Sequence, residues 1–322
     1  MKHNHDFKFL LIIFLGLAIS TWVQADESIN VQTCFPDSNL NECINSAKFG
    51  NVQLVPGIYL TDGIKLKSNL ILNIPQGSVI KLSDSAKLNN KAFGGVANAV
   101  ILAKGSKEKP LTNIHIILNG EIDGNKLVHF YEKGGCEAIN FAFVKDSSIR
   151  GSGVIHSANG DGIDIDASNN IIIEGITVKD NGGSGVHFGS PRPIYGSIGN
   201  IVLNVKSYNN GFERKRNGLD LSWPNPRGAT FINCYAENNY RNFEIQAVGS
   251  VVVNCESVNT GKVIKEDDFS GADFALVNGV NMTNKSWISV KNKILIKRDI
   301  KKLLNLIFNF EKTPEYLDSK KY

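Results

Sequence analysis

The fold is decided by a short unit that recurs along the middle of the chain, as Gly162-Ile163-Asp164-Ile165, Gly185-Val186-His187-Phe188, Gly218-Leu219-Asp220-Leu221 and Asn242-Phe243-Glu244-Ile245. Each copy alternates apolar and polar residues, which is the pattern of a half-buried β-strand. The copies recur about every 23 residues, except where a loop is inserted between two of them. Two further apolar runs and Asn/Gly turns follow each copy. We therefore interpret each repeat as one coil of three strands and three turns.

This repeat predicts an all-β fold, a right-handed parallel β-helix. One coil cannot bury its apolar face alone, so the coils must stack into a solenoid whose ends need capping. We expect the solenoid over residues 51–290 and a short helical cap over 26–50. In the remaining segment, 291–322, residues 299–310 have the apolar spacing of an amphipathic helix, which is expected to close the last coil.

A second register signal is independent of the first. Asn204, Asn233 and Asn254 occupy the same point of successive coils, where stacked amides can bond to each other. Cys234 and Cys255 directly follow two of these residues. We expect them to stack as thiols in the core, although a disulfide between them stays open.

The first 25 residues are expected to be a secretory signal peptide. A weakly basic start precedes an apolar run over 10–19, and small residues end at Ala25, where we predict cleavage. The run is shorter than a membrane anchor, and no other stretch could span a bilayer. The mature protein is thus expected outside the cell or in the periplasm, where disulfides persist. Cys34 and Cys43 are expected to pair across the N-terminal cap, and Cys136 is expected to be a buried thiol.

The formal net charge of +4 is modest, and no Lys/Arg stripe with interleaved aromatic residues occurs. This pattern excludes nucleic acid as a partner. We expect a monomer without a membrane span.

The repeated units place ionisable groups in one column. Strand alternation points this column outward, because its apolar neighbours point inward. Its members are Asn140, Asp164, His187, Asp220, Glu244 and, as a weaker match, Asp273. At a coil spacing of about 4.8 Å, Asp220 and Glu244 would be adjacent, and His187 would separate Asp164 from Asp220. Close carboxyl groups with unequal pKa values suit acid–base catalysis, and the alternative is a solvated acidic face.

Loops that follow these strands are expected to wall a groove over the column. Residues 190–196 and 222–228 are rich in proline, arginine and aromatic residues. Tyr195 and Trp223 could stack on sugar rings. Four arginines could pair with uronate carboxylates: Arg192, Arg214, Arg216 and Arg227.

On these residues the chain resembles the pectin-lyase-like β-helix superfamily, and within it the polygalacturonase family of glycoside hydrolases. Residues 119–125 (N-G-E-I-D-G-N) resemble that family's G-x-I-D-G segment. Residues 159–164 (N-G-D-G-I-D) are similar to its N-T-D-G-I-D motif, whose aspartate before the glycine is catalytic. The resemblance assigns that role to Asp161. The family's paired aspartates correspond to about Gly182-Gly183 here, and its G-H-G and R-I-K segments have no counterpart.

Three hypotheses follow. The first is a glycosidase on an acidic polysaccharide or oligosaccharide, with Asp220 and Glu244, or Asp161 and Asp164, as the acid and its partner. The second is a polysaccharide lyase or epimerase, in which Arg216, Arg227 or His187 would act and Asp164 with Asp220 could hold Ca²⁺. The third is a noncatalytic glycan-binding solenoid. No cofactor is certain from the sequence, and Ca²⁺ is a possible one if the protein is a lyase.

Overall fold

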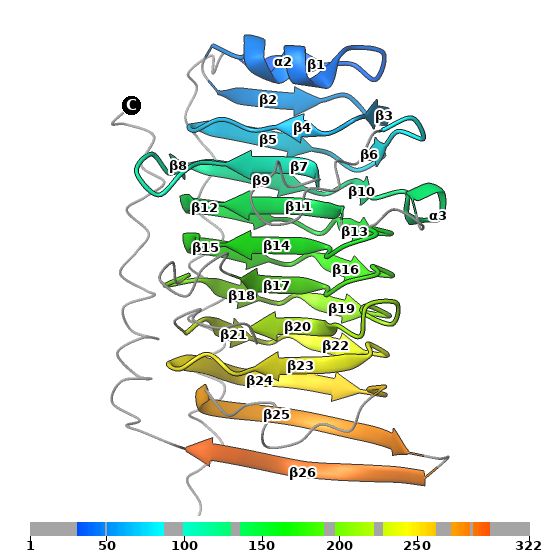
Figure 1. Ribbon diagram of the computed structural model, residues 1–322, viewed down its shortest axis with the longest axis vertical. Helices are drawn as coiled ribbons and strands as arrows, with labels where there is room; N and C mark the ends of the chain where they lie inside the picture. The colour runs from blue at the N-terminus through cyan, green and yellow to red at the C-terminus, as the bar shows by residue number, and fades with distance from the viewer. Residues whose placement is uncertain are drawn as a thin grey trace, which may run out of the picture. The chain divides into compact units, whose positions relative to one another are not determined.

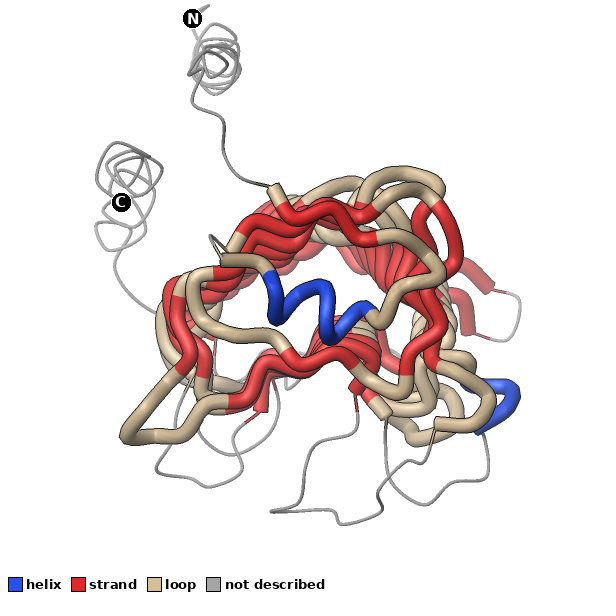
Figure 2. The backbone as a smooth tube through the Cα atoms, turned by 90° about the horizontal axis from the view of Figure 1, so that it is seen from above, coloured by secondary structure: helices blue, strands red, loops and turns tan. Residues whose placement is uncertain are grey.

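The computed structural model describes residues 31–48, 50–86, 99–129, 136–189, 197–221, 228–261, 272–283 and 286–296. Parallel strands stack coil upon coil into a β-helix (Figure 1). Seen along the stack, the coils superpose around one interior (Figure 2). We call the three sides of this stack the first, second and third faces.

The first face is a seven-stranded parallel sheet. Its strands are β4 (Ile64–Lys65), β7 (Ala99–Lys104), β11 (Glu137–Ala142), β14 (Ile163–Asp166), β17 (Val186–Gly189), β20 (Asn217–Leu221) and β23 (Arg241–Ile245). The repeated unit that dominates the sequence forms β14, β17, β20 and β23.

The other two faces belong to one 19-stranded sheet. The second face contains β1 (Gln32–Cys34), β2 (Asn51–Leu54), β5 (Leu70–Ile74), β8 (Leu111–Thr112), β9 (Ile114–Leu118), β12 (Val144–Arg150), β15 (Asn169–Glu174), β18 (Ile201–Leu203) and β21 (Thr230–Ile232). The third contains β3 (Gly57–Thr61), β6 (Ser78–Leu82), β10 (Glu121–Asp123), β13 (Val154–His156), β16 (Thr177–Lys179), β19 (Lys206–Tyr208) and β22 (Tyr235–Glu237). The long strand β24 (Ser250–Val258) pairs with both β21 and β22 and so joins the two faces.

Beyond β24 the stack ends in a strand pair. β25 (Ala272–Thr283) is parallel to β24, and β26 (Ser286–Ile296) returns antiparallel to β25. The strands therefore continue past the predicted boundary at residue 290. The prediction that Asp273 extends the acidic column was wrong, because β25 pairs with β24 of the second and third faces and not with β23. The predicted helix over 299–310 lies outside the described residues.

The front of the stack carries α2 (Leu40–Ser46), which buries Leu40 and Ile44 over the first coil. Cys34 and Cys43 form a disulfide there. A second short helix, α3 (Lys126–His129), projects at a corner between the third and first faces. No helix of the described part of the chain is long and apolar enough to cross a membrane.

The interior is filled by stacked apolar side chains. Ile139, Ile163, Val186, Leu219 and Phe243 succeed each other through the register of the first face, and all are fully buried. Cys136, Cys234 and Cys255 are buried thiols outside any disulfide. The Cys255 Sγ atom accepts a hydrogen bond from the backbone N–H of Cys234, at 3.3 Å.

Two asparagine ladders hold the turns. In the exposed ladder, Asn233 Nδ2 donates to Asn204 Oδ1 at 3.2 Å, and Asn254 Nδ2 donates to Asn233 Oδ1 at 2.8 Å. All three have positive φ, between 51° and 54°, which asparagine tolerates better than most residues. The second ladder, which the sequence reading did not identify, is fully buried and consists of Asn181, Asn210, Asn239 and Asn242, linked by side-chain bonds of 2.9 Å.

We predict that Asn210→Ala lowers the free energy of unfolding by about 2–4 kcal/mol, because it leaves several buried donors and acceptors unpaired. Asn210 Nδ2 bonds to Val178 O and Asn239 Oδ1, and its Oδ1 accepts from Asn181. The control Asn204→Gly removes one exposed bond and tolerates the positive φ, so it should cost less than about 1 kcal/mol. Denaturant titration measures both, and equal losses would contradict the buried ladder's role.

Candidate active site on the first face

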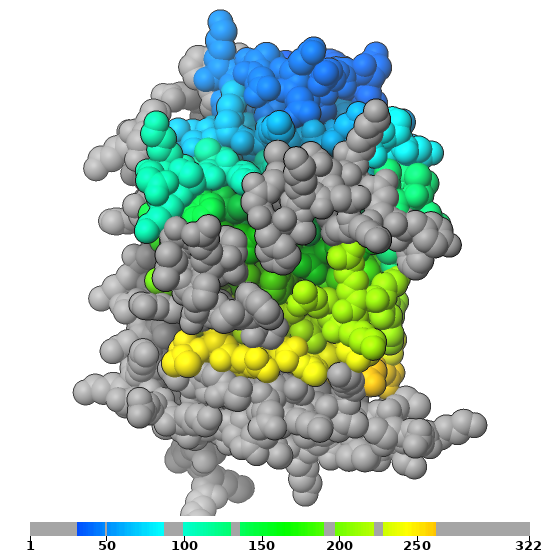
Figure 3. Space-filling model, viewed as in Figure 1, coloured from blue at the N-terminus to red at the C-terminus, as the bar shows by residue number. Residues whose placement is uncertain are grey.

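The polar column of the first face is in the register expected from the sequence. Asn140 pairs with Asp164, Asp164 with His187, His187 with Asp220, and Asp220 with Glu244. Figure 3 shows this side of the molecule, with the coils that carry the column coloured green to yellow. The column is far from fully solvated, however, because Asp164 is 8% exposed and Asp220 is 0% exposed. Buried carboxyl groups need specific partners, which argues against a purely solvated acidic face.

The centre of the site is formed by Asp161, Asp164 and His187. His187 Nδ1 donates to Asp164 Oδ1 at 2.9 Å and lies 3.6 Å from Asp161 Oδ2. One ligand atom from each of the three residues lies within 4.8 Å of those of the other two. Asp161 comes from the turn before β14, Asp164 from β14 and His187 from β17, so two neighbouring coils are sufficient to build this cluster.

Neighbouring polar groups orient these carboxylates. Asn140 Nδ2 donates to Asp164 Oδ2 at 2.9 Å. The backbone N–H of Ser184 donates to Asp161 Oδ1, and its hydroxyl donates to Asp220 Oδ2 at 3.1 Å. A side chain at Gly183 would collide with the Asp161 carboxylate. The absence of a side chain at Gly183 therefore leaves room for the Asp161 carboxylate.

Two carboxyl groups of the cluster were missed by the sequence reading. Glu137 begins β11 and lies next to Asp161, because Ala138 N bonds to Asp161 O at 3.0 Å. Asp166 follows Asp164 by two residues and so points to the same side of β14. Opposite it lies Gly189, where a Cβ atom would approach Asp166 Oδ1 to 2.6 Å. Strand alternation could have predicted Asp166, because it is two residues after Asp164 and so lies on the same side of the strand. Glu137 precedes the repeated unit, so the repeat does not predict its position.

Burial and mutual repulsion give the carboxyl groups of the site unequal pKa values. Burial, opposed by the His187 charge and reinforced by Asp164, raises the pKa of Asp161 to about 6. Burial and the Asp164 charge raise the pKa of Asp166 to about 8. Burial, with the charges of Asp164 and Asp161, raises the pKa of Glu137 well above its usual range. At neutral pH the cluster therefore contains both protonated and ionised carboxyl groups.

His187 is the positive charge among these acids. Burial disfavours its cation, but the hydrogen bond and charge of Asp164, with the charges of Asp220 and Asp161, raise its pKa to about 10. The ring is therefore an imidazolium at neutral pH. Its Nε2 atom is buried and has no hydrogen-bond partner among the described residues. An unpaired buried donor at the centre of a charged cluster is a position where a substrate oxygen could bind.

Glu244 belongs to a separate group, although it lies next to Asp220 in the register. It forms an ion pair with Arg241 through Oε1. Asn217 Nδ2 donates to its Oε2 at 2.8 Å, and Gln246 Nε2 donates to its Oε1 at 3.0 Å. The structure thus gives Glu244 a complete set of local partners. Of the two acid pairs considered from the sequence, only Asp161 and Asp164 converge on His187.

Two of the predicted substrate-binding arginines lie in the turn that leads into β20. Arg214 Nη2 donates to Asn159 Oδ1 at 3.4 Å, close in sequence to Asp161, and the charge of Arg216 lowers the pKa of Asp161. Lys126 of α3 pairs with Glu213 of the same turn at 2.8 Å. This turn therefore brings positive charge to the border of the acid cluster. The other four predicted contacts, Arg192, Tyr195, Trp223 and Arg227, lie outside the described residues.

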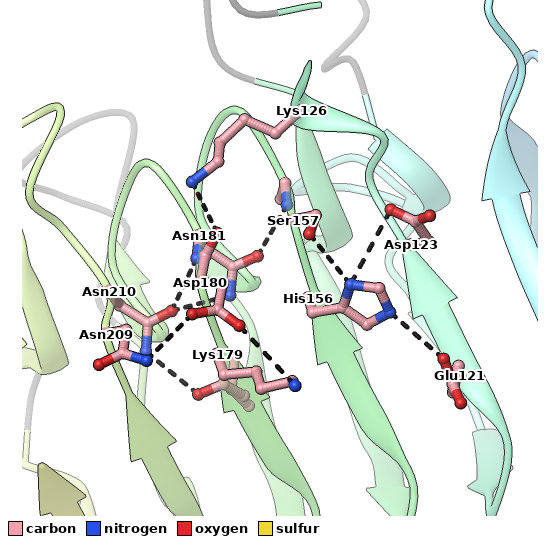
Figure 4. A network of polar contacts seen from close by, with 12 residues as sticks. Glu121, Asp123, Lys126, His156, Ser157, Lys179, Asp180, Asn181, Asn209 and Asn210 are labelled. Carbon is pink, nitrogen blue, oxygen red and sulfur yellow. Dashed lines mark hydrogen bonds and ion pairs between the residues drawn. The ribbon is translucent and has the colours of Figure 1, made fainter. Parts of the chain in front are cut away.

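The N-G-E-I-D-G-N segment is structural in this chain. Figure 4 shows His156 between Glu121 and Asp123, at 3.4 and 3.9 Å, with Ser157 Oγ at 3.0 Å from the ring. Asp123 Oδ1 also accepts from the backbone N–H of Asn125 at 2.8 Å. These groups lie on the third face and its turn. They satisfy one another and stabilise the turn before α3.

Comparisons with known proteins agree with this architecture. No family model and no curated protein matches the chain. Among solved structures, a polygalacturonase from Erwinia carotovora ssp. carotovora is similar, with a TM-score of 0.51, 16% identity, and coverage of 75% of this chain and 80% of that one. A family 28 exopolygalacturonase from Yersinia enterocolitica gives 0.40 at 14% identity, covering 80% and 66%. The Azotobacter vinelandii mannuronan C-5 epimerase AlgE4 A-module gives 0.41 at 14% identity, covering 72% and 73%.

At such low identity these similarities concern the fold and not the chemistry of the site. The stacked parallel coils and the likeness to the Erwinia structure point to one architecture. The chain has a right-handed parallel β-helix fold.

Proposed function

We propose that the protein is exported and hydrolyses glycosidic bonds of an acidic, uronate-type polysaccharide at the first face. The observation that carries this proposal is the pair of carboxyl groups with separated pKa values, Asp161 at about 6 and Asp166 at about 8, on one strand and its leading turn. Glycoside hydrolysis needs one protonated and one ionised carboxyl group, on opposite sides of the bond that is cleaved. Between these two pKa values the site offers both.

The roles follow from the protonation states. Asp166, protonated at neutral pH, is the proton donor to the leaving-group oxygen. Asp161, ionised above pH 6, acts as base or nucleophile. Asp164 is a positioning residue, because it holds the His187 ring and its negative charge keeps the proton on Asp166. The unpaired Nε2–H of His187 is available to bind a substrate oxygen on which negative charge develops.

An acidic substrate is compatible with this acidic site for two reasons. The protons retained by Glu137 and Asp166, and the imidazolium of His187, remove much of the negative charge that the sequence implies. Arg214 and Arg216 border the cluster and can pair with uronate carboxylates. The carboxylates of the substrate would thus pair with arginine next to the carboxyl groups that cleave the glycosidic bond.

A lyase or epimerase is the second candidate, and one observation favours it. Asp161, Asp164 and His187 offer ligand atoms close enough together to hold a divalent cation. Such a cation would neutralise the carboxylate of a uronate while a base removes the neighbouring proton. The cation would also compete with the Nδ1–H group of His187 for the carboxylate of Asp164. Loss of activity with a chelator would distinguish either reaction from hydrolysis, and the ultraviolet absorbance of unsaturated products would identify a lyase.

We predict that Asp161→Asn and Asp166→Asn each lower the rate of reducing-end release by about 10²- to 10⁴-fold, the range typical of lost acid–base catalysis. Glu244→Gln is the matched control on the same column, because its amide oxygen can still accept a hydrogen bond from Arg241 or from Asn217. The rate of Glu244→Gln should stay within about threefold of the parent rate, which is a much smaller change than the loss expected for the two aspartate variants. The assignment fails if Glu244→Gln is the variant that abolishes activity on a polygalacturonate panel.

We predict a bell-shaped pH dependence. Activity needs Asp161 ionised, so it should fall below pH 6, and it needs Asp166 protonated, so it should fall above pH 8. Because these groups interact, the apparent pKa values of the acid and alkaline limbs describe the whole cluster and not a single residue. Initial rates across pH measure both limbs. Residual activity of Asp166→Asn should lack the alkaline limb, and an unchanged limb would assign it to another group.

A further inference from the structure

The outer side of the second face is apolar on the last coils. Outward positions of successive strands are in direct register there, from Ile172 of β15 through β18 and β21 to β24. Five of the six outward residues on β18, β21 and β24 are aliphatic: Ile201, Leu203, Thr230, Ile232, Val251 and Val253. We call these six residues and Ile172 the aliphatic patch. Outward strand positions in a solenoid are ordinarily polar, so this patch requires an explanation.

Two comparisons within the molecule show that the patch is local. On the third face of the same coils, the outward residues are polar or amphipathic, such as Lys206, Tyr208 and Glu237. On earlier coils of the second face, the same two columns are mixed, because they carry His115, Ser148, Arg150 and Glu174 but also Ile71 and Ile117, each 38% exposed. Among the described strands of the second face that contribute to both columns, β18, β21 and β24 are thus the ones whose two columns carry no charged, amide or imidazole side chain.

The chain leaves the described structure directly beside this patch. Val251 of β24 pairs with Phe274 of β25, and Phe274 pairs with Ile296, the last residue of β26. In the backbone register, Ile296 therefore lies two strands beyond Val251, in line with Ile201 and Thr230. The segment 297–322 begins there and contributes 26 further residues.

This segment contains a sequence whose pattern and length match the patch. Residues 299–310 place apolar side chains at Ile300, Leu303, Leu304 and Ile307, the spacing of one helical face. As a helix they would be about 18 Å long. The four strands from β15 to β24 span about 14 Å at the usual strand spacing. Lys301 and Lys302 would lie off this stripe.

We propose that residues 299–310 form an amphipathic helix that docks along the aliphatic patch, parallel to the axis of the stack. The sequence alone places this helix over the end of the last coil, but the position of Ile296 favours the side of the stack. Val251 is already buried, whereas the other residues of the patch are half-buried. Burial of the remaining apolar surface of the patch, together with the apolar face of the helix, drives the contact. The helix then protects the last coils, and this inference does not depend on the proposed catalytic function.

Engineered disulfides in the full-length protein test this placement. Leu203→Cys is combined in turn with Ile300→Cys, Leu303→Cys and Ile307→Cys. The matched control places the first cysteine on the third face of the same coil, as Lys206→Cys, with the same three partners. We expect an intramolecular cross-link from Leu203→Cys with at least one partner and none from Lys206→Cys, as read by mass spectrometry of non-reduced digests.

Hydrogen exchange supplies a second readout that needs no cysteine. Amides of 299–310 should exchange at least about tenfold more slowly than in a random coil, and Ile232→Lys should remove this protection while the first face stays protected. Unprotected amides in the parent protein would overturn the proposal. So would cross-links that form only between two copies, or protection that appears only with anionic lipid vesicles, since these assign the patch to a dimer or a membrane surface.

Discussion

Stacking of coils at the strand spacing is the constraint on which the rest of this structure depends. It brings each side chain within about 5 Å of its counterparts on the coils above and below. For inward isoleucine, valine and phenylalanine, this proximity is favourable because it excludes water. For Asn181, Asn210, Asn239 and Asn242 it is favourable because each amide has one group to donate and one to accept, so that a buried row satisfies itself.

The same constraint is unfavourable for carboxylates, which can only accept hydrogen bonds when ionised. Asp161, Asp164, Asp166 and Asp220 are gathered around His187, and Glu137 lies beside the first three of them. The structure relieves their repulsion by retaining protons on some of them and by charging His187. The raised pKa values are thus a direct consequence of the stack, and the separation between Asp161 and Asp166 is what makes acid–base chemistry available near neutral pH.

Sequence reasoning identified the fold because one alternating unit recurs with a nearly constant period, and because the period fixes which residues become neighbours. It correctly aligned Asn140, Asp164, His187, Asp220 and Glu244. Sequence reasoning could not tell which of these residues are the better catalytic candidates, because the register does not show which side chains already have ion-pair or hydrogen-bond partners. Arg241, which forms an ion pair with Glu244, lies three residues away on the same strand, and strand alternation does not predict this contact. Asp273 was misplaced because the long strand β24 merges two faces, an irregularity that the repeat does not encode.

The three faces show how one rule of alternation serves different purposes. On the third face polar outward residues satisfy one another, as His156 does with Glu121 and Asp123, while Ile58 and Leu60 of β3 are exposed aliphatic residues. On the first face many outward residues are buried ionisable groups, so their stability depends on their protonation state and on any ligand that binds there. On the second face, near the end of the stack, they are aliphatic and gain most by being covered. Since the inward rows of all three faces serve the same core, the outward rows alone distinguish the faces, and the function of this solenoid must be sought in them.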